Sequence, residues 1–178
     1  VIFDTFEQIR YDMQIEFANE IRQAIDSVDN SIPCGMCCPW AGHHYLQDIA
    51  LALAGNTEPF IRLANAIYGN KTPEGIFDMN RVTAIRKHYC PEVGDFIAES
   101  DTFPQNLYSM SANQMHIHIL CNILNGLNGS KLWITDFSDN HPEQGAGFER
   151  ILSRNMNFYQ VLLQELEWYE FQGVVTPL

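Results

Sequence analysis

The chain has 178 residues, of which 46% are hydrophobic and 18% are charged, so it is long enough and apolar enough to form one globular unit with its own core. Its 10 basic and 22 acidic residues give a net charge of −12, which disfavours nucleic acid and membrane surfaces as partners. No apolar run is long enough to span a bilayer, no signal peptide opens the chain, and the five cysteines form no evenly spaced disulfide framework. We therefore expect a cytoplasmic protein.

The N-terminal third of the chain predicts a helix, a strand and a second helix. Apolar residues recur at helical spacing over residues 6–28, and polar turn residues then end this helix. Residues 32–38 form a short apolar run between turn residues, which is typical of a strand. Residues 44–55 follow as a helix that ends on Gly55, a residue suited to a helix C-cap.

The rest of the chain continues the alternation of strands and helices. Residues 59–69 fit either a strand or a helix, and the strand count takes 59–65 as a strand. Ser109 or Ser111 is expected to cap the helix that follows the strand at 95–101. The pattern predicts helices at 78–90, 111–129 and 147–170, and strands at 95–101 and 131–137.

This alternation predicts βα units and a parallel sheet. No glycine-rich phosphate loop follows any predicted strand, which argues against a nucleotide-binding doubly wound sheet. We therefore expect an α/β fold of the (β/α)8 TIM-barrel type. Only about four strands can be counted, whereas a full barrel takes roughly 250 residues. Residues 1–178 are thus predicted to be a single unit, the C-terminal half of a barrel, with residues 1–4 as the stub of the preceding strand.

Two stretches, DFIAESDT at 95–102 and GSKLWITDFSDNHPEQGAGFE at 129–149, resemble the last two strands of retaining glycoside hydrolases of the (β/α)8 clan A, especially the β-galactosidase branch. The resemblance implies that Glu99 is the catalytic nucleophile and that Trp133 is the platform on which the sugar stacks. It also implies an acid/base residue on an N-terminal half that is not present in this chain. The expected partners are a carbohydrate substrate and either that half or another copy of this chain.

Polar residues at the predicted strand ends complete the expected substrate site, because parallel α/β folds bind ligands at the carboxyl edge of the sheet. These substrate-binding candidates are Asp101, Arg62, Asn65 and Asp136, together with Trp133. Three of them have a plainer alternative: Asp101 as a turn residue, Trp133 as a core residue, and Arg62 as part of a structural charge pair. A pocket lined by carboxylates predicts a neutral sugar glycoside as substrate, with no cofactor and no metal.

Two other functional classes stay open. A segment rich in thiols and imidazoles could form a zinc site or supply a cysteine nucleophile, although no second ligand pair follows at metal spacing. Its residues are Cys34, Cys37, Cys38, His43 and His44. His116 and His118 are two residues apart on a helix, so they face different directions and do not form a two-histidine metal site. The other class that stays open is a non-catalytic carbohydrate-binding barrel domain.

Overall fold

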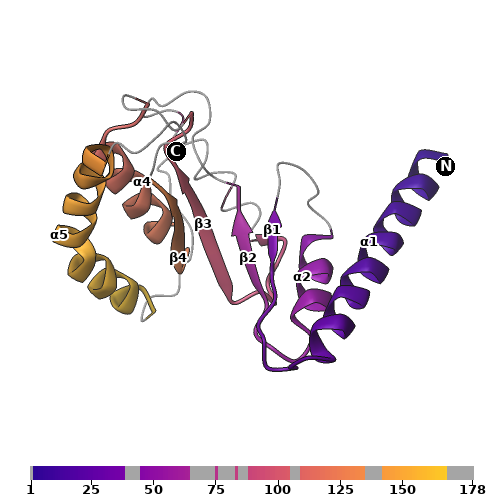
Figure 1. Ribbon diagram of the computed structural model, residues 1–178. Coiled ribbons are helices and arrows are strands. Elements are labelled where there is room, and N and C mark those ends of the chain that lie inside the picture. Colours follow the sequence, from indigo (N-terminus) through magenta and orange to yellow (C-terminus); the bar gives the residue numbers. More distant parts are fainter. Residues whose placement is uncertain are drawn as a thin grey trace, which may run out of the picture.

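The computed structural model describes residues 2–38, 45–64, 75, 83, 88–104, 109–134 and 142–167. None of the helices in this described part combines the length and the hydropathy needed to cross a bilayer. The arrangement is shown in Figure 1. In chain order the elements are α1 (Ile2–Asp26), β1 (Met36–Cys38), α2 (Leu46–Ala54), β2 (Phe60–Leu63), β3 (Asp95–Asp101), α4 (Ala112–Leu124), β4 (Gly129–Trp133) and α5 (Pro142–Glu167).

The four strands form one parallel sheet in the order β1-β2-β3-β4, so each strand pairs with the next one along the chain. This confirms the predicted α/β class with a parallel sheet. β2 shows that the ambiguous run at 59–69 begins with a strand. β3 has both of its predicted ends, whereas β4 begins at Gly129 and not at Lys131.

The prediction that residues 1–4 are the stub of a strand is wrong for the described part of that segment, because Ile2 already belongs to α1. The helical spacing of apolar residues extends further toward the N-terminus than expected: Ile2, Phe6, Ile9 and Met13 follow one another at intervals of four, three and four. A period of 3.6 places these side chains on one face of a helix, whereas a strand would alternate them.

The helix ends carry the predicted caps. Ser111 has an extended backbone, and its hydroxyl accepts a hydrogen bond from the Gln114 amide at 3.1 Å, so Ser111 is the N-cap of α4. The Ser109 hydroxyl instead donates to the Thr102 carbonyl. Gly55 follows α2 with a φ of 58°, a region that favours glycine, and so confirms the predicted C-cap. Of the helix predicted at 78–90, Thr83 and His88 are helical, Tyr89 and Cys90 lie beyond its end, and the other positions lie outside the described residues.

Two apolar cores cover one face of the sheet. The first lies between the strands and α2 and comprises Cys38, Leu46, Ala50, Ile61, Leu63, Cys90, Val93, Phe96, Ala98 and Leu127. The second joins α4 to α5 and comprises Met110, Met115, Ile119, Ile123, Phe148, Leu152 and Tyr159. Because the helices bury this face, the polar side chains of the strands can gather only on the opposite face.

Arg22 joins α1 to the loop between α1 and β1 and to the end of α2. Its side chain is buried, and its Nε and Nη2 atoms donate to Asp26 Oδ1 at 2.9 and 2.5 Å. Its Nη1 atom donates to the Ile32 carbonyl at 2.9 Å and to the Leu53 carbonyl at 3.4 Å. A Cβ at Gly55 would lie 2.8 Å from Arg22 Cδ, so glycine is also needed there for space. Arg22 thus satisfies carbonyls that would otherwise be left without a donor.

We predict that Arg22→Met lowers the free energy of unfolding by about 2–3 kcal/mol, because the Leu53 and Ile32 carbonyls and Asp26 lose their donor while the apolar stem is kept. Urea unfolding followed by circular dichroism measures this change. Arg10→Met is the matched control, since Arg10 is exposed and its ion pair with Glu7 contributes less than about 1 kcal/mol. Equal stability of the two variants would show that the buried contacts of Arg22 do not stabilise the fold.

Candidate active site

Glu99 and Asp101 lie on the face of the sheet opposite to the one on which the described helices pack. Successive side chains of a strand point to opposite faces. Phe96 and Ala98 belong to the core beneath α2, so Ile97, Glu99 and Asp101 point the other way. The two carboxylates therefore share a face, at the carboxyl end of the longest described strand.

Arg62 reaches this pair from the neighbouring strand. It is the register partner of Ile97, so it points to the same face as Glu99. Its Nη1 atom lies 2.7 Å from Glu99 Oε1, and the two side chains are 19% and 18% exposed. A charge-assisted contact of this length in a half-buried setting fixes the orientation of the carboxylate. Of the two roles predicted for Arg62, the structure therefore shows a pairing with a neighbouring carboxylate.

Asp101 and Trp133 end their strands side by side, because they are register partners in β3 and β4. Asp101 is only 7% exposed, which does not fit a solvated turn residue. Trp133 is 40% exposed, so it is not a core residue. An exposed indole beside a buried carboxylate offers an apolar face and a hydrogen-bond acceptor to one ligand.

Hydrogen bonds hold the chain just beyond these strand ends. The Thr102 amide donates to the Trp133 carbonyl at 3.2 Å, which continues the β3–β4 pairing past Asp101. The Ser109 hydroxyl donates to the Thr102 carbonyl and ties the return of the chain to the same point. The backbone that carries Asp101 and Trp133 is thus fixed on both sides.

Lys131 is a member of this face that the sequence reasoning missed. It is exposed, and it is the register partner of Glu99 in β4. Glu99 therefore lies between a lysine on one neighbouring strand and Arg62 on the other. Only the β3–β4 register could have revealed Lys131, because nothing in its local sequence sets it apart from a surface lysine. Asn65 and Asp136, which were also predicted to bind substrate, lie outside the described residues.

The thiols of the alternative site lie in different surroundings. Cys34 is half-buried, Cys37 is exposed and Cys38 is buried, and all three are reduced thiols. Burial, with Cys38 as a close neighbour, raises the pKa of Cys90 to about 11. His43 and His44 lie outside the described residues. Across the described ranges, no three His, Cys, Asp or Glu side chains come close enough to hold a metal ion.

The two histidines of α4 face different directions, as predicted. His118 is fully buried, whereas His116 Nδ1 lies 2.6 Å from the hydroxyl of Tyr159 on α5. Burial raises the pKa of Tyr159, so its hydroxyl stays protonated and can donate to the imidazole. Both histidines serve the packing of α4.

Comparison with protein-family models, with curated proteins and with solved structures gives no match to this chain.

We predict that a thiol reagent at pH 8 labels Cys37 rapidly and leaves Cys90 unlabelled until the protein unfolds. Cys37 is exposed, whereas Cys90 is buried and, with a pKa of about 11, only about a thousandth of it is thiolate at this pH. Peptide mapping after timed alkylation gives the rate at each cysteine, with Cys37→Ser as the control. Fast labelling of Cys90 in the folded chain would contradict the core in which it is placed.

Proposed function

We propose that this chain is the C-terminal half of a (β/α)8 barrel and belongs to a cytoplasmic glycoside hydrolase, similar to β-galactosidases, that acts on a neutral sugar by a retaining mechanism. The observation that carries the proposal is the position of Glu99. It lies two residues before the end of β3, it is held by Arg62, and it shares one face and one edge of the sheet with Asp101 and Trp133.

The order of the strands supports a barrel. In a doubly wound sheet the strand order reverses at a switch point, and ligands bind there. The described strands run β1-β2-β3-β4 without reversal, each parallel to the last, as successive strands of a barrel do. Helices α2 and α4 cover one face of this sheet (Figure 1), which corresponds to the outside of a barrel. The face that bears Glu99 then corresponds to the inside.

The residues of this face can take the roles that retaining hydrolysis requires. Glu99, ionised and oriented by Arg62, attacks the anomeric carbon, and a carbon–oxygen bond to Glu99 forms as the glycosidic bond breaks. The leaving oxygen takes its proton from an acid/base residue on the N-terminal half. Water then attacks the same carbon and gives its proton to that residue, which frees Glu99. Trp133 supports the sugar ring, and Asp101 accepts a hydrogen bond from a hydroxyl.

The proposed substrate is a neutral glycoside. Glu99 and Asp101 bring two carboxylates to the sugar, and Arg62 is already engaged by one of them. A negatively charged group on the sugar would therefore be repelled by these carboxylates in a setting that is shielded from water. Asn65 and Asp136 are proposed to add further contacts to sugar hydroxyls.

We predict that Glu99→Gln lowers turnover by several orders of magnitude in the protein that also carries the N-terminal half, because the covalent step is lost. Asp101→Asn should instead mainly raise KM, since a hydroxyl contact is weakened while the nucleophile remains. Steady-state kinetics on a dinitrophenyl glycoside measure both changes. This substrate is chosen because its leaving group needs no proton, so the attachment of the sugar to Glu99 does not require a proton from the acid/base residue.

Azide provides the control for the role of Glu99. In Glu99→Ala it should enter the space left by the carboxylate, restore turnover and give the glycosyl azide of inverted configuration. Both single variants should keep the circular dichroism spectrum of the parent. If Glu99→Gln keeps near-normal turnover while Asp101→Asn does not, the two roles are reversed. If neither change matters, the glycosidase proposal fails.

A further inference from the structure

Helix α1 carries an apolar stripe that the described structure leaves uncovered. The N-terminal half of α1 extends past α2, on which the helix packs through its other side (Figure 1). The exposed side chains of the stripe occupy positions at helical spacing. They are Ile2, Phe6, Ile9, Met13 and Phe17, with exposed fractions of 54% to 89%. Soluble proteins rarely leave a continuous apolar stripe of this kind in water, so it marks a surface that another segment covers.

The position of α1 indicates what kind of segment this is. A helix that joins two parallel strands covers both of them, as α2 covers β1 and β2. α1 runs into β1 in the same way, but among the described elements no strand precedes it. β1 is also an edge of the described sheet, so its outer side is open to a further strand. The stripe and the free edge of β1 therefore lie at the place where one more βα unit would be added.

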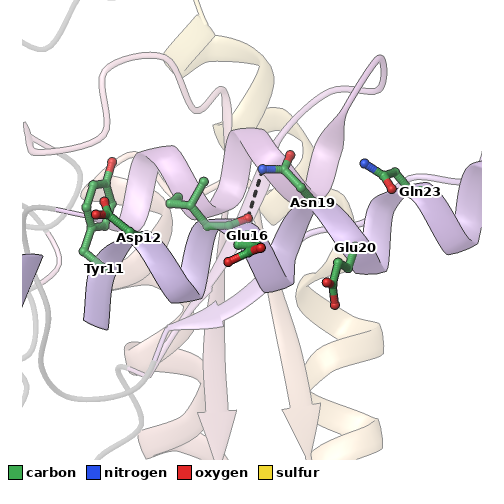
Figure 2. Close-up of a pocket in the computed structure, with 7 residues that line it drawn as sticks. Tyr11, Asp12, Glu16, Asn19, Glu20 and Gln23 are labelled. Carbon is green, nitrogen blue, oxygen red and sulfur yellow. Dashed lines mark hydrogen bonds between the residues drawn. The ribbon is translucent and has the colours of Figure 1, made fainter. Parts of the chain in front are cut away.

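Charge argues against a second copy of this chain as the occupant. Within Ile2–Asp26, α1 has six acidic and two basic residues, a net charge of −4. Asp12, Glu16 and Glu20 follow one another along one side of the helix (Figure 2). Since each residue turns the helix by about 100°, this acidic row borders the stripe next to Met13 and Phe17. Two copies of α1 packed together would bring two acidic rows close to each other, in chains that each carry −12.

We propose that the stripe of α1 and the outer edge of β1 together receive a parallel β-strand with its helix, from the polypeptide that precedes α1 in the same protein. This rests on the proposed function, because that segment would belong to the N-terminal half of the barrel. It also refines the proposal: the first contact between the halves is an apolar one along α1, with basic side chains of the incoming unit facing Asp12, Glu16 and Glu20. The acid/base residue would then be carried to the same edge of the sheet as Glu99.

The test is a titration of the 178-residue chain with the separately expressed polypeptide encoded directly upstream of Val1. We expect a one-to-one complex in sedimentation velocity, loss of binding of a hydrophobic dye, and new protection of the Met36–Cys38 amides in hydrogen exchange. The double variant Phe6→Ser and Met13→Ser should weaken the complex about a hundredfold, because two large apolar side chains no longer become buried. The matched double variant Gln8→Ser and Gln23→Ser, on the polar sides of the same helix, should bind like the parent.

Several results would overturn the proposal. These are the absence of a complex, a complex that the Phe6→Ser and Met13→Ser variant does not weaken, or unchanged exchange at Met36–Cys38. A homodimer of the parent chain that this variant dissociates would show a second copy to be the occupant instead. The azide rescue of Glu99→Ala separates this test from the proposed function. Docking without azide rescue would support the interface and contradict the glycosidase proposal. Azide rescue without docking at α1 would support the glycosidase proposal and contradict the interface.

Discussion

The parallel pairing of β3 with β2 on one side and β4 on the other determines what the sheet presents to a ligand. Glu99 and Asp101 share a face because they are two residues apart in β3. The register then brings Arg62 against Glu99 from β2 and places Trp133 beside Asp101 from β4. A slip of one residue in either pairing would turn these side chains toward the helices, so the register is the constraint on which the candidate site depends.

The two faces of the described sheet differ in how they are packed. On the helix side of the sheet, apolar cores and the buried contacts of Arg22 hold α1, α2, α4 and α5 in place. On the other side, polar residues of three strands face away from these cores, and α1 carries an apolar stripe that the described residues leave exposed. Both features have one explanation if further strands continue the sheet beyond β1. Such strands would cover the stripe and enclose the face that bears Glu99.

The sequence predicted the fold well where its signals were local. The apolar period of α1, the cap at Ser111 and the glycine at Gly55 are readable without a structure, because each depends on residues a few positions apart. The helical start of α1 was missed because Ile2 and Phe3 alone fit a strand equally well. The type of β2 stayed open for the same reason, since three apolar positions cannot separate a strand from a helix.

The site was less predictable, because its geometry depends on pairing between distant segments. Glu99, Asp101 and Trp133 could be named from their strand ends, but the ion pair of Arg62 with Glu99 joins residues 37 positions apart. Lys131 could not be found at all without the register of β4 against β3. Burial likewise separates Cys38 from the exposed Cys37, although the two thiols are neighbours in the sequence.

Trapping of the covalent intermediate tests most directly whether Glu99 is the nucleophile. A 2-deoxy-2-fluoro galactoside with a dinitrophenolate leaving group slows the release of the sugar from the enzyme more than its attachment, so the glycosyl ester accumulates. After digestion, mass spectrometry of the peptide that spans residues 95–101 locates the sugar. If Glu99 is the nucleophile, we expect one sugar in ester linkage to Glu99, and none in the Glu99→Gln variant. A sugar attached to Asp101 or to another residue, or no covalent adduct while the substrate is turned over, would contradict it.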